Sequence, residues 1–154
     1  SAVSPFNAFL ISQGLETLSL RMERHVANAQ RVAEWLEARP EVGTVHYAGL
    51  PSSPYYERAR QYAPRGAGAV LAFELEGGAE AGQAFVSALQ LHSHVANIGD
   101  VRSLVIHPAS TTHSQLTAEQ LEAAHLSEDL VRLSVGIENV EDIIADLDQA
   151  LAKV

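Results

Sequence analysis

Apolar side chains recur at helical spacing through the first part of the chain. Ser4 followed by Pro5 is typical of a helix start, because serine caps free backbone amides and proline tolerates the first helical position. The pattern of three- and four-residue spacings continues until Pro40, which cannot extend a helix. We therefore expect a long helical region over residues 1–40, bent or divided at Gly14, that leads into the rest of the chain.

Strand-like and helix-like segments alternate over residues 41–154. Apolar runs predict strands at 42–47, 69–76, 95–98, 103–106 and 130–135. Helical spacing predicts helices at 55–62, 79–91 and 140–151, and a capping box from Thr117 to Gln120 predicts one more short helix. This order suits the α/β (α+β) class, with a small mixed sheet and helices on one face. The first helical region is long for such a domain, so part of its apolar surface is expected to meet another domain or subunit.

Composition indicates one soluble globular core and excludes several classes of partner. The 154 residues are 47% hydrophobic and 19% charged, as in ordinary globular domains. The net charge of −9 leaves no basic surface for nucleic acid or an anionic membrane. No apolar run approaches the roughly 18 residues that span a bilayer, and without cysteine there is neither a disulfide nor a thiolate nucleophile. We therefore expect a cytoplasmic protein.

Lysine is almost absent from the chain. All ten basic residues except Lys153 are arginine, and Lys153 lies one residue before the C-terminus. No buried lysine is therefore available to form a Schiff base. The chain also begins at Ser1 without an initiator methionine, which predicts a fragment or a processed product of a longer protein.

Four of the seven histidines cluster in one segment, which raises a metal-site hypothesis. His92 and His94 would project to the same side of an extended segment as two zinc ligands, with His107 or His113 as a third. Asp100 is the one acidic residue nearby that could act as a general base. The alternative, which we favour, is that these histidines hydrogen-bond loop backbone around a polar cleft.

A Ser-His-Asp hydrolase can also be considered for this segment. Ser110, Ser114, His113 and Asp100 supply the side chains. No Gly-x-Ser-x-Gly turn is present, however, to hold a serine above an oxyanion hole. This hypothesis therefore has little support.

Arg132 stands in the middle of an otherwise apolar strand segment. Burying its charge is costly unless a carboxylate or phosphate meets it. The planar guanidinium suits bidentate capture of a carboxylate, which predicts a site for a small acid. An internal ion pair with one of the 19 acidic residues explains the pattern equally well. Without a cofactor, the same arginine would fit a stand-alone module that binds a small carboxylic acid or a partner protein.

Several segments resemble motifs of the Cys/Met-metabolism pyridoxal-phosphate enzymes. They occur in the family's order and are residues 4–10, 13–25, 97–113 and 131–138. The resemblance implies the aspartate-aminotransferase (fold type I) architecture, with residues 41–154 as its small C-terminal, substrate-binding domain. It also implies that the Schiff-base lysine and the other pyridoxal-phosphate contacts lie on a large domain outside this chain. The fragment would then hold no cofactor, no metal and no catalytic residue, whereas the parent would be a pyridoxal-phosphate enzyme and a homo-oligomer.

The motifs refine what the resemblance implies. The segment 97–100 replaces the Ser-Leu-Gly-Gly of most lyases and cystathionine synthases and resembles the sulfhydrylase branch, which converts O-acetylhomoserine and sulfide to homocysteine and acetate. A cystathionine synthase or lyase is the alternative. Arg132 matches the arginine that clamps the substrate α-carboxylate, Asn97 falls where the lyases' serine contacts the same region, and Thr112 matches a threonine that supports the arginine or cofactor side. The bidentate pair would orient the amino acid, and a neutral amide would add a second donor.

Overall fold

The computed structural model describes residues 2–154. Its helices are α1 (Pro5–Glu16), α2 (Leu18–Glu37), α3 (Tyr56–Tyr62), α4 (Gly78–Ala88), α5 (Ala118–Ala123) and α6 (Val140–Leu151), with a 3-10 turn η1 (Pro108–Ser110). Its strands are β1 (Val42–His46), β2 (Val70–Leu75), β3 (Ser93–His94), β4 (Leu104–Ile106) and β5 (Leu130–Ser134). The strands form a sheet in the order β1-β2-β5-β4-β3, antiparallel except for the parallel pair β3 and β4. The prediction of a small mixed sheet in an α/β domain is confirmed.

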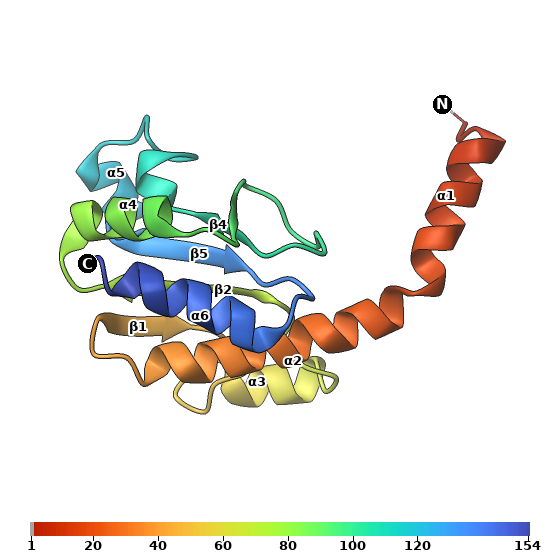
Figure 1. Cartoon of the computed structure of the whole chain (residues 1–154), viewed down its shortest axis with the longest axis horizontal. Helices are drawn as coiled ribbons and strands as arrows, with labels where there is room; N and C mark the ends of the chain where they lie inside the picture. Colours follow the sequence, from red (N-terminus) through yellow and green to blue (C-terminus); the bar gives the residue numbers. More distant parts are fainter. Residues whose placement is uncertain (1) are drawn as a thin grey trace.

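The main core lies between the sheet and the layer formed by α2, α4 and α6 (Figure 1). Alternate residues of β2 face this layer, and Leu71, Phe73 and Leu75 are buried. Phe73 meets Phe85 of α4 edge-on, with ring centroids 5.6 Å apart and an interplanar angle of 89°. Burial at every second residue fixes the register, because a slip of one residue would turn the apolar set away from the helices.

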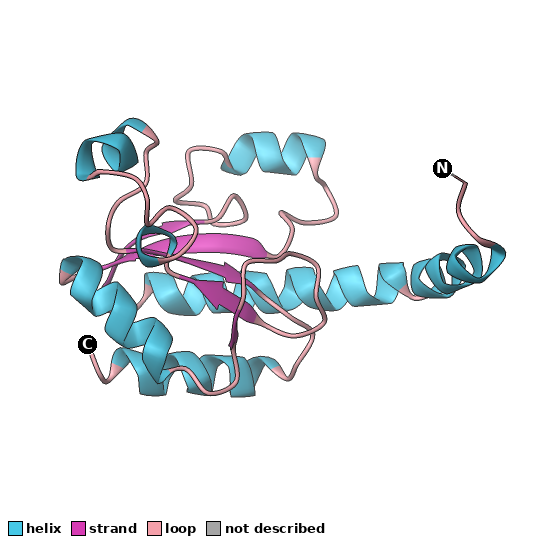
Figure 2. Ribbon diagram, turned by 90° about the horizontal axis from the view of Figure 1, so that it is seen from above, coloured by secondary structure: helices cyan, strands magenta, loops and turns pink. Residues whose placement is uncertain are grey.

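The opposite face of the sheet carries Arg132. Ala72 of β2 and Ile106 of β4 are the cross-strand partners of Arg132 in β5. Since side chains alternate along a strand, these three residues face away from the core helices. Figure 2 shows the short α5 on this side of the strands and α4 and α6 on the other.

The first helical region divides at Thr17 instead of at Gly14, which stays helical. The Thr17 backbone leaves the helical conformation at φ −106° and ψ 8°, and α2 begins at the next residue. Arg21 explains the position of the break. Its guanidinium donates to the Gly14 carbonyl oxygen at 2.9 Å and to the Thr17 hydroxyl, so it satisfies the free end of α1.

α1 projects from the body of the domain (Figure 1). Ser4 caps it by accepting a hydrogen bond from the Asn7 amide at 3.2 Å, as the Ser4-Pro5 pair predicts. The helix has no buried residue, and its large apolar side chains are exposed: Phe6, Phe9, Leu10, Ile11 and Leu15. That this apolar surface meets another domain or subunit stays a prediction.

The strand predicted at 95–98 is wrong, and a loop takes its place. β3 ends one residue before this segment. Because its partner β4 ends at Ile106, the residues beyond Val95 have no strand to pair with. Val95 and Ile98 are 51% and 61% exposed, so their apolar character does not mark burial. The loop between β3 and β4 carries Asn97.

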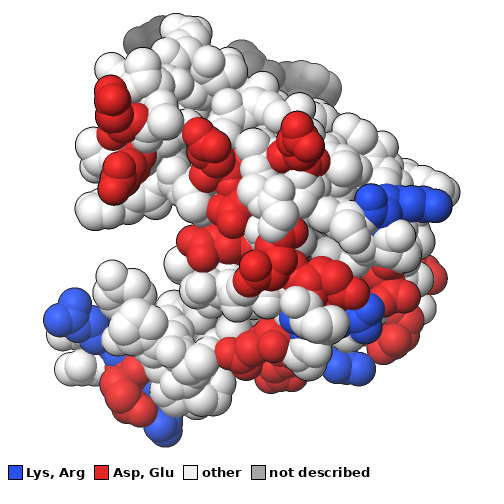
Figure 3. Space-filling model, turned by 90° about the vertical axis from the view of Figure 1, so that its left-hand side faces the viewer, with Lys and Arg blue, Asp and Glu red and all other residues white. Residues whose placement is uncertain are grey.

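Acidic side chains dominate the charged surface, in keeping with the net charge of −9. Figure 3 shows them spread from the left-hand edge across the middle of one face, with the fewer Lys and Arg side chains at the lower left, at the right and between the acidic ones. An anionic ligand would therefore be recognised by local contacts, such as those of Arg132, because the overall field does not attract it. No helix in residues 2–154 is long and apolar enough to cross a membrane.

Candidate functional site

A hollow on the open face of the sheet brings the three predicted site residues together. Its volume is about 470 Å³. Its lining is formed by Ala72, Ala96, Asn97, Ile98, Ile106, Pro108, Thr112, His113, Leu126, Leu130 and Arg132. Arg132 comes from β5, Asn97 from the β3–β4 loop and Thr112 from the loop after η1. We call this hollow the Arg132 pocket.

Arg132 is half-buried and has no counter-ion in the described part of the chain. Its Nη2 atom lies 3.5 Å from the Asn97 carbonyl oxygen, at the limit of hydrogen bonding. Among residues 2–154 no carboxylate oxygen lies within 4.0 Å of the guanidinium. The internal ion pair considered from the sequence is therefore not formed, and most of the N–H donors are free to meet an external anion.

Asn97 faces Arg132 with its backbone instead of its side chain. Its Oδ1 atom accepts a hydrogen bond from the Ile98 amide at 2.8 Å, a local contact that asparagine favours in turns. Gly99 follows at φ 75°, a left-handed conformation that glycine adopts without strain. The exposed Nδ2 atom of Asn97 donates to no atom of residues 2–154, so it is available as a second donor.

Thr112 lines the same pocket without a hydrogen bond to Arg132. Its hydroxyl oxygen lies 2.8 Å from His113 Nδ1. Neither residue forms a hydrogen bond to the Arg132 guanidinium within the described residues. A role for Thr112 would therefore need direct contact with a ligand or with a group outside residues 2–154.

The four clustered histidines do not converge. His92 is buried and hydrogen-bonds Asp146, whereas His94 is exposed, so the two do not project together as zinc ligands would. His107 is buried, with its Nε2 atom 2.7 Å from the Glu128 carbonyl oxygen. Residues 2–154 contain no group of three or more His, Asp or Glu residues arranged for a metal ion. His92 and His107 instead bond polar groups of the loops and of α6.

The side chains of the hydrolase hypothesis are also separated. The Ser110 hydroxyl bonds His107, with 2.8 Å between Oγ and Nδ1, instead of His113. The other ring nitrogen of His107 meets a backbone carbonyl, so no carboxylate supports this histidine. Asp100 pairs with Arg102 in the β3–β4 loop, with 3.1 Å between Oδ2 and Nη2.

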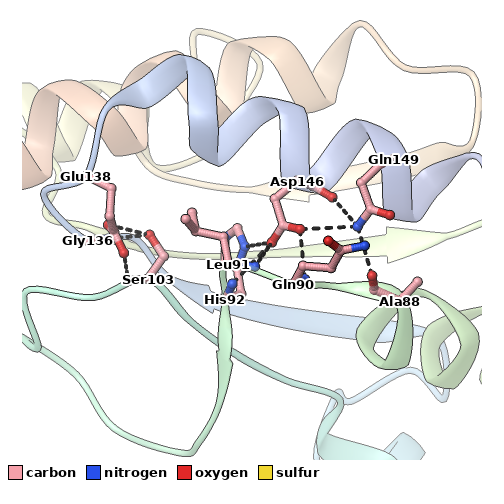
Figure 4. A network of polar contacts seen from close by, with 9 residues as sticks. All are labelled: Ala88, Gln90, Leu91, His92, Ser103, Gly136, Glu138, Asp146 and Gln149. Carbon is pink, nitrogen blue, oxygen red and sulfur yellow. Dashed lines mark hydrogen bonds and ion pairs between the residues drawn. The ribbon is translucent and has the colours of Figure 1, made fainter.

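Contacts that the sequence analysis missed hold the two ends of the loop that bears Asn97. Asp146 of α6 bonds His92 before β3, and Glu138 bonds Ser103 before β4 (Figure 4). Burial raises the pKa of Asp146, but hydrogen bonds from His92 and three backbone amides outweigh it, so the net pKa is lowered. Burial lowers the pKa of His92 against the opposing effect of Asp146. Asp146 is the one sequence feature that indicates these contacts, because it is an acidic residue within the apolar stripe of α6.

The fold defines a mixed α/β domain, and comparison with known proteins identifies its family. Residues 1–152 match the family described as Cys/Met metabolism PLP-dependent enzyme. The chain is 54% identical over 98% of its length to O-acetyl-L-homoserine sulfhydrylase 1 of Thermus thermophilus, and 53% identical over 97% to L-methionine gamma-lyase of Porphyromonas gingivalis. A Campylobacter jejuni crystal structure assigned as an O-acetylhomoserine (thiol)-lyase, with N'-pyridoxyl-lysine-5'-monophosphate, matches 98% of this chain at a TM-score of 0.89 and 43% identity. The chain belongs to the Cys/Met metabolism PLP-dependent enzymes.

The chain spans a little over a third of the length of these relatives: 36% of the Thermus protein, 37% of the Porphyromonas protein and 36% of the Campylobacter chain. Lys153, the one lysine of the sequence, is exposed after α6 and does not line the Arg132 pocket. Enzymes of this cofactor hold pyridoxal phosphate through a lysine Schiff base. Lys153 is therefore not placed to form such a Schiff base at the Arg132 pocket.

Proposed function

We propose that this chain is the substrate-carboxylate-binding part of a pyridoxal-phosphate-dependent sulfhydrylase that converts O-acetylhomoserine and sulfide to homocysteine and acetate. The observation that supports this function is Arg132, a half-buried residue of β5 whose guanidinium has no acidic partner in residues 2–154. The guanidinium lies at a pocket with mostly apolar walls and lacks a counter-ion there, and a substrate α-carboxylate would supply one.

The pocket suits an amino acid held by its acid group. Two N–H groups of Arg132 can bind both carboxylate oxygens in one plane, which limits rotation of the substrate. The free amide of Asn97 would add a neutral donor to the same group. Ala72, Ile106 and Leu130 give the pocket apolar walls, which keep water away from the ion pair and so strengthen it.

Bond making and breaking is assigned to groups outside residues 2–154. Pyridoxal phosphate, when bound by such groups, serves as an electron sink. This chain would contribute orientation of the substrate through Arg132 and Asn97, with Thr112 as a further contact at the pocket. Alone, it is proposed to be catalytically inactive.

The test is an NMR titration of the 154-residue chain with L-norvaline and with its carboxamide, followed through the backbone amides that line the Arg132 pocket. A carboxylate site predicts that the acid shifts these resonances and that the uncharged carboxamide does not. Arg132→Leu should abolish the response, whereas Arg58→Leu on exposed α3 should leave it unchanged. Equal responses to the acid and the carboxamide, or a response that survives Arg132→Leu, would overturn the proposal.

A lyase that acts on L-methionine is the second candidate, because the relative of that name is 53% identical against 54% for the sulfhydrylase. A chimera in which this chain replaces the matching segment of the Thermus enzyme separates the two. The chimera should keep the ratio of homocysteine formation to methionine cleavage of the unmodified enzyme if this chain is of the sulfhydrylase type. A shift toward methionine cleavage supports the lyase, and cysteine offered in place of sulfide tests the cystathionine synthase branch.

A further inference from the structure

The loop that carries Asn97 is fixed mainly at its ends. It runs from β3 to β4 and places the Asn97 carbonyl oxygen 3.5 Å from Arg132 Nη2. Every residue from 95 to 102 is exposed except the half-buried Asp100, so the loop gains little from core packing. Its position beside Arg132 therefore depends on how its two ends are held.

Asp146 holds the chain just before β3. Its Oδ1 atom accepts a hydrogen bond from the Gln90 amide at 2.8 Å. Its Oδ2 atom accepts the Leu91 amide at 2.9 Å, the His92 amide at 3.1 Å and the His92 ring Nδ1–H at 2.8 Å (Figure 4). Bonds to an ionised carboxylate are about twice as strong as neutral ones, so this end of the loop is held firmly to α6.

Glu138 holds the chain just before β4. Its Oε1 atom accepts the Ser103 amide at 2.6 Å, and its Oε2 atom accepts the Ser103 hydroxyl at 2.9 Å. The same hydroxyl accepts the Gly136 amide at 2.9 Å. A Cβ atom at Gly136 would lie 2.2 Å from Glu138 Oε2 and 2.5 Å from Ser103 N, so only glycine allows this close approach.

The two ends are tied to each other and to α2. The Ser93 amide donates to the Ser103 carbonyl oxygen at 3.0 Å, which joins the ends across β3 and β4. Asn28 of α2 donates to the carbonyl oxygens of Gly136 at 3.0 Å and Glu138 at 2.9 Å. The Glu138 backbone is therefore fixed by a helix while its side chain reaches the loop.

We propose that Glu138 and Asp146 are positioning residues that set the Asn97 loop against Arg132 and so complete the carboxylate site. The inference rests on the proposed function of the Arg132 pocket. Neither carboxylate lines that pocket, so each acts through backbone that it holds at one end of the loop. Loss of either carboxylate would loosen one end of the loop, although the Val101 carbonyl oxygen would still accept the Ile137 amide at 2.9 Å. The Asn97 carbonyl and amide would then move more freely relative to the guanidinium, and carboxylate affinity would fall without loss of any group that touches the ligand.

The experiment compares three variants of the 154-residue chain. Glu138→Leu removes both acceptors of Ser103, Glu138→Gln keeps one acceptor and the side-chain shape, and Glu141→Gln removes an exposed charge of α6 as the control. Amide hydrogen exchange of residues 96–103 follows the loop, and the Kd of L-norvaline follows the site. Glu138→Leu should speed exchange of the Ser103 amide and weaken L-norvaline binding roughly three- to tenfold. Glu138→Gln should recover most of the affinity, and Glu141→Gln should match the original chain.

The outcomes separate the positioning role from the function of the pocket. If the original chain binds L-norvaline no better than Arg132→Leu does, the proposed function itself is overturned. If the original chain binds L-norvaline and Glu138→Leu binds it equally well, only the positioning role is overturned, whether or not loop exchange is faster. If Glu138→Leu does not fold, Ser103→Ala provides the same comparison, because it removes the hydroxyl alone. Asp146→Asn should weaken L-norvaline binding by loosening the other end of the loop.

Discussion

Arg132 and Asn97 meet through the Asn97 backbone, whose carbonyl oxygen lies 3.5 Å from the Nη2 atom of Arg132. A carbonyl can orient a guanidinium but cannot neutralise it, whereas a carboxylate would do both. The contact therefore keeps Arg132 at the pocket and leaves its positive charge for a ligand. The loop that supplies this carbonyl belongs to the site even where its side chains point elsewhere.

Arg132→Leu should cost the chain little or no stability. No ion pair within residues 2–154 is lost, and leucine suits the apolar neighbours Ala72 and Ile106. We expect the free energy of unfolding in urea to change by less than about 1 kcal/mol, or to rise. A loss of about 3 kcal/mol or more would be the cost of breaking a buried ion pair and would contradict a free guanidinium.

Alanine at two glycines should have opposite effects. A Cβ at Gly136 would lie 2.5 Å from the Ser103 nitrogen and from the Val101 carbonyl oxygen, so Gly136→Ala should destabilise the chain by about 2 kcal/mol or more. Gly14 in α1 has no atom within 4 Å of an added Cβ, and alanine is the better helix former by up to about 1 kcal/mol. Because α1 projects from the domain, the gain from Gly14→Ala should appear as helix content in far-UV circular dichroism. Equal unfolding midpoints for Gly136→Ala and the original chain would contradict the close approach at Gly136.

Asn97→Ala should weaken L-norvaline binding less than Arg132→Leu does. The side-chain amide of Asn97 is exposed and neutral, and a hydrogen bond of that kind contributes roughly threefold to tenfold in affinity. The backbone carbonyl that meets Arg132 stays in place in this variant. A loss as large as that of Arg132→Leu would mean that the Asn97 side chain, and not the loop backbone, governs the site.

Local patterns of the sequence predicted most of the elements. The helix predicted at 140–151 matches α6, and the capping box at Thr117 forms as expected, with the Thr117 amide 2.9 Å from Gln120 Oε1. These features depend on residues a few positions apart, which spacing reveals directly. The break at Thr17 depends on the hydrogen bonds of Arg21, and the loop at 95–98 depends on the short length of β4. The spacing of apolar residues shows neither.

The residues of the candidate site also differ in how far the sequence predicts them. Arg132 is predictable because a charge interrupts an apolar strand, whereas Asn97 and Thr112 are predicted through the family resemblance. The contacts that hold the loop join residues far apart in the chain: Glu138 and Ser103 are 35 positions apart. No periodicity connects such residues, so only the folded structure shows their relationship.

Acid should destabilise the domain through His92. Burial lowers the pKa of His92 from its ordinary value of 6.5, so the unfolded chain takes up a proton at a pH where the folded chain does not. The stabilising contribution is therefore complete above pH 6.5 and declines as the pH falls below it. The structure gives the reason, because Nδ1 already donates to Asp146 and the buried Nε2 has no partner within residues 2–154, so a second proton would be buried without an acceptor.

Urea unfolding from about pH 7.5 to about pH 5 should show a shallower loss of stability in His92→Gln than in the original chain, because glutamine does not titrate in this range. His94→Gln, at an exposed position, should keep the original slope, and an unchanged slope in His92→Gln would show that His92 does not contribute to the acid sensitivity.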